Sequence, residues 1–335
     1  MKVVRYTAPG GIGRLDVRET NDPGLPGANE VRVRILGSSL NGHDLNVVKG
    51  ILPVEEDRIL MSDGAGIVEA TGAGVNEFAV GDRVVSTFFP DWERGDAPRA
   101  GFSRTPGDGL DGYAVEVVVR PVNFFTHMPR DWSFTEASTL TTAGLTAWRA
   151  VKVIPHFEAQ SDVLVLGTGG VSIFAVQFAK WQGARVIVTS SSDEKLERAR
   201  TVGADFGVNY RKNENWSAKV LELTDGRGVD LVVETGGPGT LPESMRATRI
   251  GGDIVLVGVL TGIQGQIPTA ALMGRQQTLH GITVGSRDHQ IQMIRALDTT
   301  KLRPVTDAVL PLAGIREAFQ MLESQRHFGK LCLTY

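Results

Sequence analysis

The sequence predicts a two-part α/β protein, in which an all-β region precedes a doubly wound parallel sheet. The first third of the chain holds short alternating strands between glycine turns, and the middle third alternates apolar strands with amphipathic helices. Glycine is also abundant, with 40 of 335 residues. Short strands with glycine turns are typical of a small barrel or sandwich. Strands that alternate with helices are typical of a doubly wound α/β domain.

The all-β region is predicted over residues 1–124. Its clearest strand is Val31–Ile35, where apolar and charged residues alternate with the period of a half-buried strand. Further short strands are predicted at Met1–Arg5, Gly66–Ala70, Asp82–Val85 and Tyr113–Val117.

The α/β region is predicted over residues 125–268, beginning with a helix over Thr135–Val151. Continuous apolar runs suit parallel strands buried on both faces. The first helix between them, Val171–Gln182, is closed by Gly183. The next helix begins at Ser191, with Glu194 at capping-box spacing, and ends near Gly203. The apolar runs are Asp162–Leu166, Arg185–Val188, Asp230–Val233 and Asp253–Val257.

The remaining residues, 269–335, read as a return segment that completes the edge of the parallel sheet and then the first domain. They contain a predicted helix, Ile315–Ser324, and a last strand, Lys330–Thr334. The short β-prone stretch Leu279–Val284 is predicted to be an exposed sheet edge that pairs with a second copy, with burial inside its own subunit as the alternative.

Charge and cysteine content exclude several classes of protein. With 35 basic and 38 acidic residues the net charge is −3, which gives no electrostatic footprint for nucleic acid or an anionic membrane. The single cysteine, Cys332, excludes an internal disulfide and a cysteine-rich zinc site. It fits a reducing compartment. No apolar run reaches the ~18 residues of a membrane span, and the N-terminus lacks a signal peptide pattern, so we expect a cytoplasmic protein.

A glycine turn follows the first apolar strand of the middle region. The stretch Val163–Ser172 reads VLVLGTGGVS. Gly167 permits a tight turn, and Gly169 lets the backbone approach a pyrophosphate at a helix N-terminus. Ser172 takes the third glycine position and is small enough for close packing. The alternative is a glycine turn that binds no nucleotide. The predicted dinucleotide site comprises Gly167, Thr168, Gly169, Gly170 and Val171.

The end of the second strand predicts which nicotinamide cofactor binds. An acidic residue there would bond a ribose 2′-hydroxyl, but this chain has a run of hydroxyls that includes Ser190 and Ser191, with Lys195 one helical turn further. Donors and a positive charge favour a 2′-phosphate, and Tyr210 is placed to close the adenine pocket. The sequence therefore predicts NADPH. The alternative is that Ser191 merely caps the helix and Lys195 is a solvated surface charge.

With these motifs in place, the chain resembles the medium-chain dehydrogenase/reductase family, and within it the zinc-free quinone oxidoreductase branch. The resemblance implies an N-terminal GroES-like β-barrel domain, a Rossmann domain and a homodimer or homotetramer. It also places Asn41, Thr142, Thr146, Gly258 and Lys330 beside the cofactor, although Lys330 could instead simply cap a strand. The resemblance rests on the glycine turn and on Ser38–Leu45, Ser62–Gly66, Val80–Val84 and Gly144–Trp148.

The resemblance also implies where zinc-dependent members hold their metal. They have Cys where this chain has Asn41, Gly-His-Glu where it has Met61-Ser62-Asp63, and Cys or Asp near Thr142. Asn, Ser and Thr are poor zinc ligands, so no metal is predicted. Metal binding by His43, Asp44 and Asp63 is the alternative to a role in which the two aspartates anchor loops through hydrogen bonds. The stretch Pro90–Asp111, which matches the structural zinc lobe, has no cysteine. The other histidines lack metal-ligand spacing: His127, His156, His280, His289 and His327.

Without zinc, the chemistry implied is hydride transfer to a quinone or an α,β-unsaturated carbonyl. Such substrates place negative charge on oxygen, which hydrogen-bond donors can stabilise. The predicted donors are Asn41, Ser62 and Thr142, with His43 as a further candidate. Asn46 stands where many relatives carry Tyr, and Phe88–Trp92 is either an apolar wall for a flat substrate or core packing.

We therefore expect an NADPH-dependent reductase of quinones or activated alkenes, with a small carbonyl or quinone as substrate and no nucleic acid or membrane partner. Two alternatives are a zinc-independent alcohol or aldehyde oxidoreductase and an NADPH-binding structural or regulatory protein without turnover. A metal-dependent alcohol dehydrogenase would require bound zinc.

Overall fold

The computed structural model describes residues 1–99, 101–154 and 158–335, which leaves His156 outside the described residues. The chain divides into two compact units. The first unit comprises residues 1–145 and 285–335, and the second comprises residues 146–284. Across the described residues no helix is long and apolar enough to cross a membrane.

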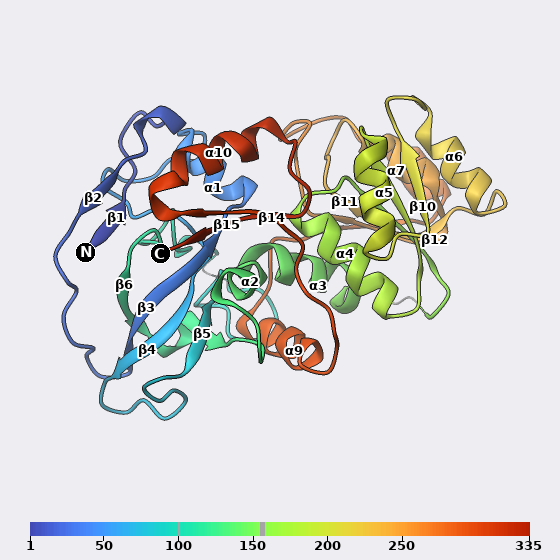
Figure 1. Ribbon diagram of the computed structural model, residues 1–335. Helices are drawn as coiled ribbons and strands as arrows, with labels where there is room; N and C mark the ends of the chain where they lie inside the picture. Colours follow the sequence, from blue (N-terminus) through green and yellow to red (C-terminus); the bar gives the residue numbers. More distant parts are fainter. Residues whose placement is uncertain (100, 155–157) are drawn as a thin grey trace. The chain divides into compact units, whose positions relative to one another are not determined.

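The first unit is built on a seven-stranded sheet with the order β14-β15-β3-β4-β5-β7 and with β6 on β3 (Figure 1). A separate two-stranded sheet pairs β1 with β2. The strands are β1 (Lys2–Val4), β2 (Val17–Glu19), β3 (Glu30–Ser39), β4 (Ala65–Thr71), β5 (Arg83–Ser86), β6 (Val117–Pro121), β7 (Phe125–His127), β14 (Thr306–Pro311) and β15 (Lys330–Thr334). The helices are α1 (Gly42–Val48), α2 (Phe134–Ser138), α9 (Arg287–Leu297) and α10 (Ile315–Ser324).

Strand β3 organises this unit. Its N-terminal half pairs antiparallel with β6 and its C-terminal end with β15, while β4 pairs along it with register shifts after Arg32 and Ile35. Alternate residues Val31, Val33 and Ile35 are buried in the core, as the sequence alternation predicts. The strand ends at Ser39, so the residues that follow it lie where β15 begins. Helix α10 and strand β15 have the predicted bounds within residues 269–335, and strand β14 of the same segment was not predicted.

One predicted strand of the first unit was misplaced. Residues 113–117 were expected to form a strand, but β6 begins at Val117, and Val115 makes a single bridge to Val3. The amides of Gly112, Tyr113 and Ala114 instead donate to carbonyls of residues 59–61. Because these amides bond to the loop at residues 59–61, they are not available for a regular strand pairing.

The predicted helix over Thr135–Val151 is helical but interrupted. It consists of α2, a π-helical turn at Leu140–Gly144, α3 (Leu145–Trp148) and a second π-helical turn at Arg149–Val153. The boundary between the units falls within it, at 145/146, whereas the sequence suggested 124/125. The physical reason is that Thr141 and Thr142 hydrogen-bond to residues of the first unit.

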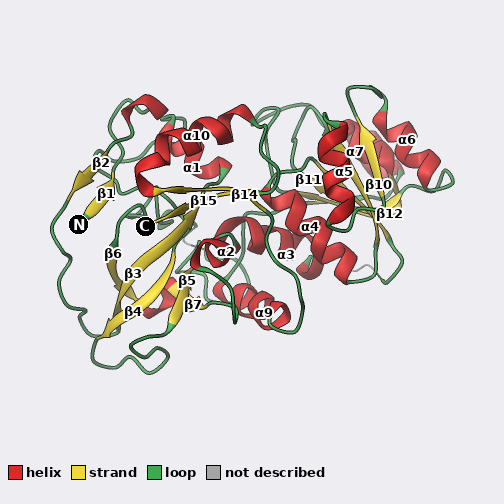
Figure 2. Ribbon diagram, in the orientation of Figure 1, coloured by secondary structure: helices red, strands yellow, loops and turns green. Residues whose placement is uncertain are grey.

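The second unit is an all-parallel, six-stranded sheet with the order β10-β9-β8-β11-β12-β13 (Figure 2). This is the doubly wound order of a Rossmann sheet. Helices α4 and α5 pack on one face, and α6 and α7 bury Trp216, Val220, Leu241 and Met245 against the other. The strands are β8 (Asp162–Leu166), β9 (Arg185–Ser190), β10 (Phe206–Asn209), β11 (Val229–Glu234), β12 (Thr248–Leu256) and β13 (Thr278–Gly281). The helices are α4 (Gly170–Trp181), α5 (Asp193–Thr201), α6 (Trp216–Leu223), α7 (Leu241–Ala247) and α8 (Thr269–Gly274).

The N-terminus of α5 lies one residue beyond the predicted position. Ser192, not Ser191, is the N-cap, and its hydroxyl accepts a hydrogen bond from the Lys195 amide at 3.3 Å. The predicted capping box of Ser191 with Glu194 is therefore wrong. Three consecutive serines each suit an N-cap, and the length of β9, which runs through Ser190, decides which of them takes it.

Candidate functional site

A buried carboxylate, Asp63, is the centre of a polar network in the first unit. Its side chain is fully buried just before β4. Oδ2 accepts hydrogen bonds from the Ser39 hydroxyl at 2.5 Å and from Asn41 Nδ2 at 2.8 Å, and Oδ1 accepts one from the Thr142 hydroxyl at 2.6 Å. Gly64 follows because a Cβ there would lie 2.6 Å from the Tyr113 ring. The glycine after Asp63 therefore lets the Tyr113 ring pack directly on the backbone next to the buried carboxylate.

A second buried carboxylate, Asp44, organises the start of α1. Its Oδ2 accepts a hydrogen bond from the Asn41 backbone amide at 2.9 Å, which belongs to the capping box at the start of α1, and a second one from Asn41 Nδ2 at 3.0 Å. Its Oδ1 accepts from the backbone and hydroxyl of Ser62, both at 2.9 Å. The two aspartates therefore anchor the loops after β3 and before β4, which was one of the two roles the sequence left open.

Lys330, the first residue of β15, supplies the positive charge of the network. Its side chain is 3% exposed, and Nζ donates to the Leu40 carbonyl at 2.6 Å and to Asn41 Oδ1 at 2.5 Å. Nζ also lies 3.8 Å from Asp63 Oδ2. Because an ammonium can only donate, Lys330 fixes the orientation of the Asn41 amide. Asn41 Nδ2 must then face the carboxylates.

Burial changes the acidity of Asp63. Removal of the carboxylate from water, together with the nearby Asp44 charge, raises the pKa of Asp63 to about 6, although the Lys330 ammonium acts in the opposite direction. Hydrogen bonds from Asn41 and Ser39 stabilise the ionised form. Asp63 therefore exchanges its proton close to neutral pH, which is common for groups in functional sites.

His43 connects this network to an aromatic cluster. It is the second residue of α1, its ring packs edge-on against Phe88 with centroids 5.3 Å apart, and its Nε2 lies 3.2 Å from Asp108 Oδ2. Burial lowers the pKa of His43, but the Asp108 contact and the charges of Asp44 and Asp63 outweigh burial, so the pKa is raised. The imidazolium form is favoured as a result.

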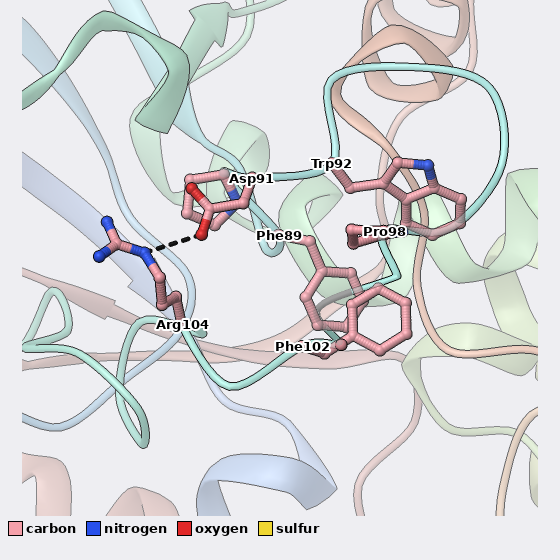
Figure 3. Close-up of a pocket in the computed structure, with 8 residues that line it drawn as sticks. Phe89, Asp91, Trp92, Pro98, Phe102 and Arg104 are labelled. Atoms are coloured by element: carbon pink, nitrogen blue, oxygen red, sulfur yellow. Dashed lines mark ion pairs between the residues drawn. The ribbon is translucent and has the colours of Figure 1, made fainter.

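The segment Phe88–Trp92 packs largely on itself. Phe88, Phe89 and Trp92 are buried, and Phe89 stacks on Phe102 with centroids 4.1 Å apart. Figure 3 shows this stack beside Trp92, with the Asp91–Arg104 ion pair at 2.7 Å to one side. The adjoining cavity has a volume of about 10 Å³. The rings therefore form a core with a small opening, and only a small group could enter it.

The residues at the positions of the relatives' zinc ligands do not fit a metal. Asn41, Ser62 and Thr142 donate their hydrogens to Asp44 and Asp63, and an ammonium already lies beside these carboxylates. A dication there would be repelled by Lys330 and would find amide and hydroxyl groups in place of thiolate or imidazole ligands. Among the described residues, no group of three or more His, Cys, Asp or Glu side chains could hold a metal ion.

The glycine turn of the second unit has the geometry of a pyrophosphate cradle. Gly167 has a φ of +75°, which favours glycine, and Gly169 is the N-cap of α4. A Cβ added at Gly169 would meet no atom within 4 Å, so the space beside it can admit a ligand. Ser172 donates to the Leu166 carbonyl at 2.7 Å and ties the helix to the strand. Thr168 is buried and Gly170 and Val171 are half-buried in the first turn. These residues fit a dinucleotide.

The residues predicted to bind a 2′-phosphate gather at the ends of β9 and β10. Ser190 is buried and its hydroxyl accepts from the Ser192 amide at 3.3 Å, while Ser191 and Lys195 are half-buried. Tyr210 is 42% exposed, and its amide donates to the Ser190 carbonyl. The first turn of α5 carries two acidic residues, Asp193 and Glu194, and Asp193 bonds Asn209 at 2.6 Å and Lys212. Ser190 and Tyr210 therefore lie together, and a cation partners Asp193.

The other predicted cofactor residues are scattered. Thr146 is buried in α3, and Gly258 follows β12 where a Cβ would lie 2.3 Å from the Thr235 carbonyl oxygen. Close backbone packing alone thus accounts for Gly258. Asn41, Thr142 and Lys330 belong to the network of the first unit.

Sequence reasoning named Lys330 as a site residue but did not predict its part in the carboxylate network, and it missed a second participant. A lysine that opens a largely apolar, buried strand was the available signal for Lys330. Sequence reasoning overlooked Asp108, which lies 65 positions from His43 in a polar loop and gives no signal in the sequence. The predicted donors Asn41, Ser62 and Thr142 do come together, but their hydrogens point to carboxylates.

Comparisons with known proteins agree with this architecture. The sequence matches the alcohol dehydrogenase GroES-like domain over residues 27–130 and the zinc-binding dehydrogenase family over residues 170–299. A zinc-type alcohol dehydrogenase-like protein of Schizosaccharomyces pombe is 36% identical over 99% of both chains. A quinone oxidoreductase of Pseudomonas aeruginosa is 32% identical over 78% of this chain and 74% of that protein. The solved structure of an NAD-dependent alcohol dehydrogenase is 36% identical, covers 100% of both chains and has a TM-score of 0.91.

Proposed function

Because the chain belongs to the medium-chain dehydrogenase/reductase superfamily, whose relatives are oxidoreductases, we propose that it is an NADPH-dependent reductase of quinones or α,β-unsaturated carbonyls that works without zinc. One observation carries the proposal. Asn41, Ser62 and Thr142 are engaged as hydrogen-bond donors around two carboxylates, and the positive charge comes from Lys330. A site of this kind can stabilise charge only through protons.

The proposed contact with substrate is made through Thr142. Thr142 is the most exposed residue of the network, at 9%, and its hydroxyl donates to Asp63 when that carboxyl is ionised. When Asp63 is protonated, its own O–H can donate to Thr142 Oγ1, and the Thr142 hydrogen becomes available to a carbonyl oxygen. Asn41 and Ser62 hold the two carboxylates in place for this exchange. A bound NADPH would supply the hydride.

The preference for NADPH rests on the ends of β9 and β10. A 2′-phosphate would meet Ser190, Ser191 and Lys195, and one of the two acidic side chains in the first turn of α5, Asp193, already binds Lys212 and Asn209. The turn from Gly167 to Val171 would hold the pyrophosphate. The NAD-dependent relative described above shares this fold, so the fold by itself does not predict NADPH and the proposal depends on these side chains.

The test is consumption of NADPH in the presence of 1,4-benzoquinone, an enone or an aldehyde. We expect turnover with the quinone or the enone, no zinc by elemental analysis, and an unchanged rate in EDTA. Inactivation by EDTA with rescue by zinc would overturn the zinc-free mechanism. NADPH binding without turnover on any acceptor would favour the structural or regulatory alternative.

A second candidate, an alcohol or aldehyde oxidoreductase, is favoured by the similarity to the alcohol dehydrogenase structure over the whole chain. Without a metal, ionisation of an alcohol hydroxyl would depend on Asp63 and its neighbours, which makes alcohol oxidation the harder direction. Oxidation of simple alcohols by NADP⁺ at a rate that matches quinone reduction would reverse our ranking.

We also propose a homodimer or homotetramer, located in the cytoplasm. Strand β13 ends the six-stranded sheet, with Thr278 and Gly281 exposed, and exposed apolar side chains such as Leu260, Ile263 and Met273 lie in the segment before it. Pairing of the β13 edge with the same edge of a second copy would cover the strand edge and these apolar side chains. Light scattering should give at least twice the chain mass of 36.1 kDa, and a monomer at micromolar concentration would refute this assembly.

A further inference from the structure

Glu234, the last residue of β11, is a buried carboxylate that the proposed chemistry does not use. Its side chain is fully buried. Oε1 accepts hydrogen bonds from the backbone amides of Gly236 and Gly237 at 2.7 and 3.0 Å and from the Thr240 hydroxyl at 2.7 Å. The carboxylate therefore fixes the loop of residues 235–240, which joins its own strand to α7.

The contacts of this carboxylate serve the loop and not the strand. A fourth hydrogen bond reaches Oε2 from the Ser244 hydroxyl of α7, so all four of these donors are neutral groups. Burial of a carboxylate is costly unless hydrogen bonds compensate for the lost water. An apolar side chain would complete the strand without that cost, which indicates that Glu234 is present for the loop that it holds.

The loop of residues 235–240 lies where a doubly wound sheet binds its ligand. The strand order reverses between β8 and β11, and ligands of such sheets bind outside the carboxyl ends of the strands at this switch point. The glycine turn follows β8, and the loop follows β11. The two are in contact, because the Thr235 hydroxyl donates to the Leu166 carbonyl at 3.0 Å. A Cβ at Gly167 would lie 3.8 Å from the same hydroxyl oxygen.

A second loop, which follows β12, packs against the first. Thr261 donates through its amide and its hydroxyl to the Gly236 carbonyl, at 2.7 and 2.8 Å, and its hydroxyl accepts from the Gly239 amide at 2.8 Å. The backbones approach closely, since a Cβ at Gly258 would lie 2.3 Å from the Thr235 carbonyl oxygen. The position of the second loop therefore depends on the first, and so on the buried carboxylate.

We propose that Glu234 is a positioning residue for the cofactor, and that the loop it fixes forms the wall against which the nicotinamide half of NADPH binds. This inference rests on the proposed function, because it concerns the cofactor of that reaction. Each half of a doubly wound sheet binds one mononucleotide. The proposed 2′-phosphate site lies at the ends of β9 and β10, which gives the adenosine half to those strands and leaves the nicotinamide half to β11 and β12.

This role predicts a separation among ligands. The fragment 2′,5′-ADP would meet the residues that follow β8, β9 and β10, whereas NADPH and NADH would both need the loop after β11. A carboxylate that only stabilised the second unit would, in the folded protein, affect the three ligands alike or affect none of them. Lys195→Ala provides the complementary pattern, since we expect it to weaken ligands that carry a 2′-phosphate and to spare NADH.

The experiment measures the affinity of the whole protein for NADPH, NADH and 2′,5′-ADP by calorimetry, at a temperature where circular dichroism shows each variant folded. Glu234→Met removes the acceptor and keeps most of the volume, and Glu234→Gln returns an acceptor oxygen. Thr240→Val removes one donor and serves if Glu234→Met does not fold. Asp230→Leu is the matched control, because Asp230 is a buried carboxylate at the opposite end of the same strand, where it bonds Arg227 and Arg249.

We expect Glu234→Met to weaken NADPH and NADH by about tenfold each, the size of one or two lost hydrogen bonds, with less than about twofold change for 2′,5′-ADP. Thr240→Val should show the same selectivity at about threefold. Glu234→Gln should restore most of the affinity. Asp230→Leu should lower the midpoint of unfolding in urea and leave all three affinities unchanged.

The positioning role and the proposed reductase fail separately. The role is overturned, and the reductase stands, if no folded variant at Glu234 or Thr240 weakens the dinucleotides, or if 2′,5′-ADP loses as much affinity as NADPH. Loss of NADPH affinity with NADH spared would place the loop at the 2′-phosphate and would also overturn the role. So would an equal loss in Asp230→Leu. A wild-type protein that binds neither dinucleotide would overturn the reductase and the role together.

Discussion

The glycine turn of the second unit and the carboxylate network of the first unit are built in opposite ways. The turn uses consecutive residues, Gly167 to Ser172, and its function depends on backbone geometry and on the absence of side chains. The network draws Ser39, Asn41, Asp63, Thr142 and Lys330 from positions up to 291 residues apart, and it depends on which donor meets which acceptor.

This difference predicts how each region responds to change. A backbone cradle is robust to substitution of surrounding side chains, because the amides that bind a phosphate remain. A network with two buried carboxylates and one ammonium is sensitive to substitution, since removal of any one charge leaves the remaining buried charges without a partner. Substitutions in the network should therefore cost stability as well as activity, whereas those at the cofactor site should mainly change affinity.

The largest effect should come from Lys330→Met, which removes the ammonium and keeps most of the side chain's volume. Loss of one partner from a buried ionic cluster typically costs about 3–5 kcal/mol, and we expect a loss of this size in the free energy of unfolding above pH 7, measured with urea. The loss should shrink at pH 5, where Asp63 can be protonated.

Lys49→Met is the matched control for that substitution. Lys49 forms an ion pair with Glu323 at 2.8 Å, in which both side chains are substantially exposed. Such pairs contribute about 1 kcal/mol or less. If the two lysine variants lose similar stability, the ammonium is not needed by the carboxylates.

The second effect concerns the pH dependence of stability through Asp63. Its pKa in the folded protein, about 6, lies above its ordinary value of 3.8, so the folded state binds more protons than the unfolded state between these values. Stability from this group is present below pH 4 and is lost as the pH rises through 6. The loss is on the order of 3 kcal/mol.

The comparison between the wild type and Asp63→Asn isolates this contribution. Other carboxyls act in the opposite sense, because hydrogen bonds from Arg32 lower the pKa of Asp22 and those from Lys212 lower the pKa of Asp193. The variant should therefore gain stability relative to the wild type as the pH rises from 4.5 to 7. Unfolding curves whose difference is independent of pH would contradict the buried, protonated carboxyl.

The same contrast explains what the sequence could and could not predict. Helix α10, strand β15 and the Gly167 turn were located correctly, because apolar periodicity and glycine are local signals. The pairing of His43 with Asp108, and the orientation of the Asn41 amide by Lys330, depend on contacts between distant segments that leave no spacing pattern. Even the local error at α5 has this origin, since the pairing of β9 through Ser190 selects Ser192 as the N-cap.

A smaller effect is expected at the cofactor site from Lys195→Ala. Loss of a hydrogen bond to a phosphate should weaken NADPH binding by about 1.5–3 kcal/mol, and NADH binding should barely change. Titration of both cofactors by fluorescence measures this, with Lys180→Ala as the control because Lys180 pairs with Asp205. The wild type should bind NADPH at least tenfold more tightly than NADH, and equal affinities would end the NADPH assignment.

The smallest effect should be the kinetic one of Asn41→Ala, which tests whether the two regions act independently. Loss of a direct oxyanion donor typically costs ~10²–10³ in turnover. Since the Asn41 hydrogens go to Asp44 and Asp63, we expect a loss of only about tenfold, about 1.4 kcal/mol, through misplaced carboxylates. NADPH affinity should stay unchanged, because the cradle of the second unit is built without this residue. The measurement is kcat with 1,4-benzoquinone at a temperature where circular dichroism shows the variant folded, with the exposed Asn76→Ala as its control. A loss of a thousandfold would make Asn41 a direct donor to the substrate, and full activity would show that the carboxylates keep their places without it.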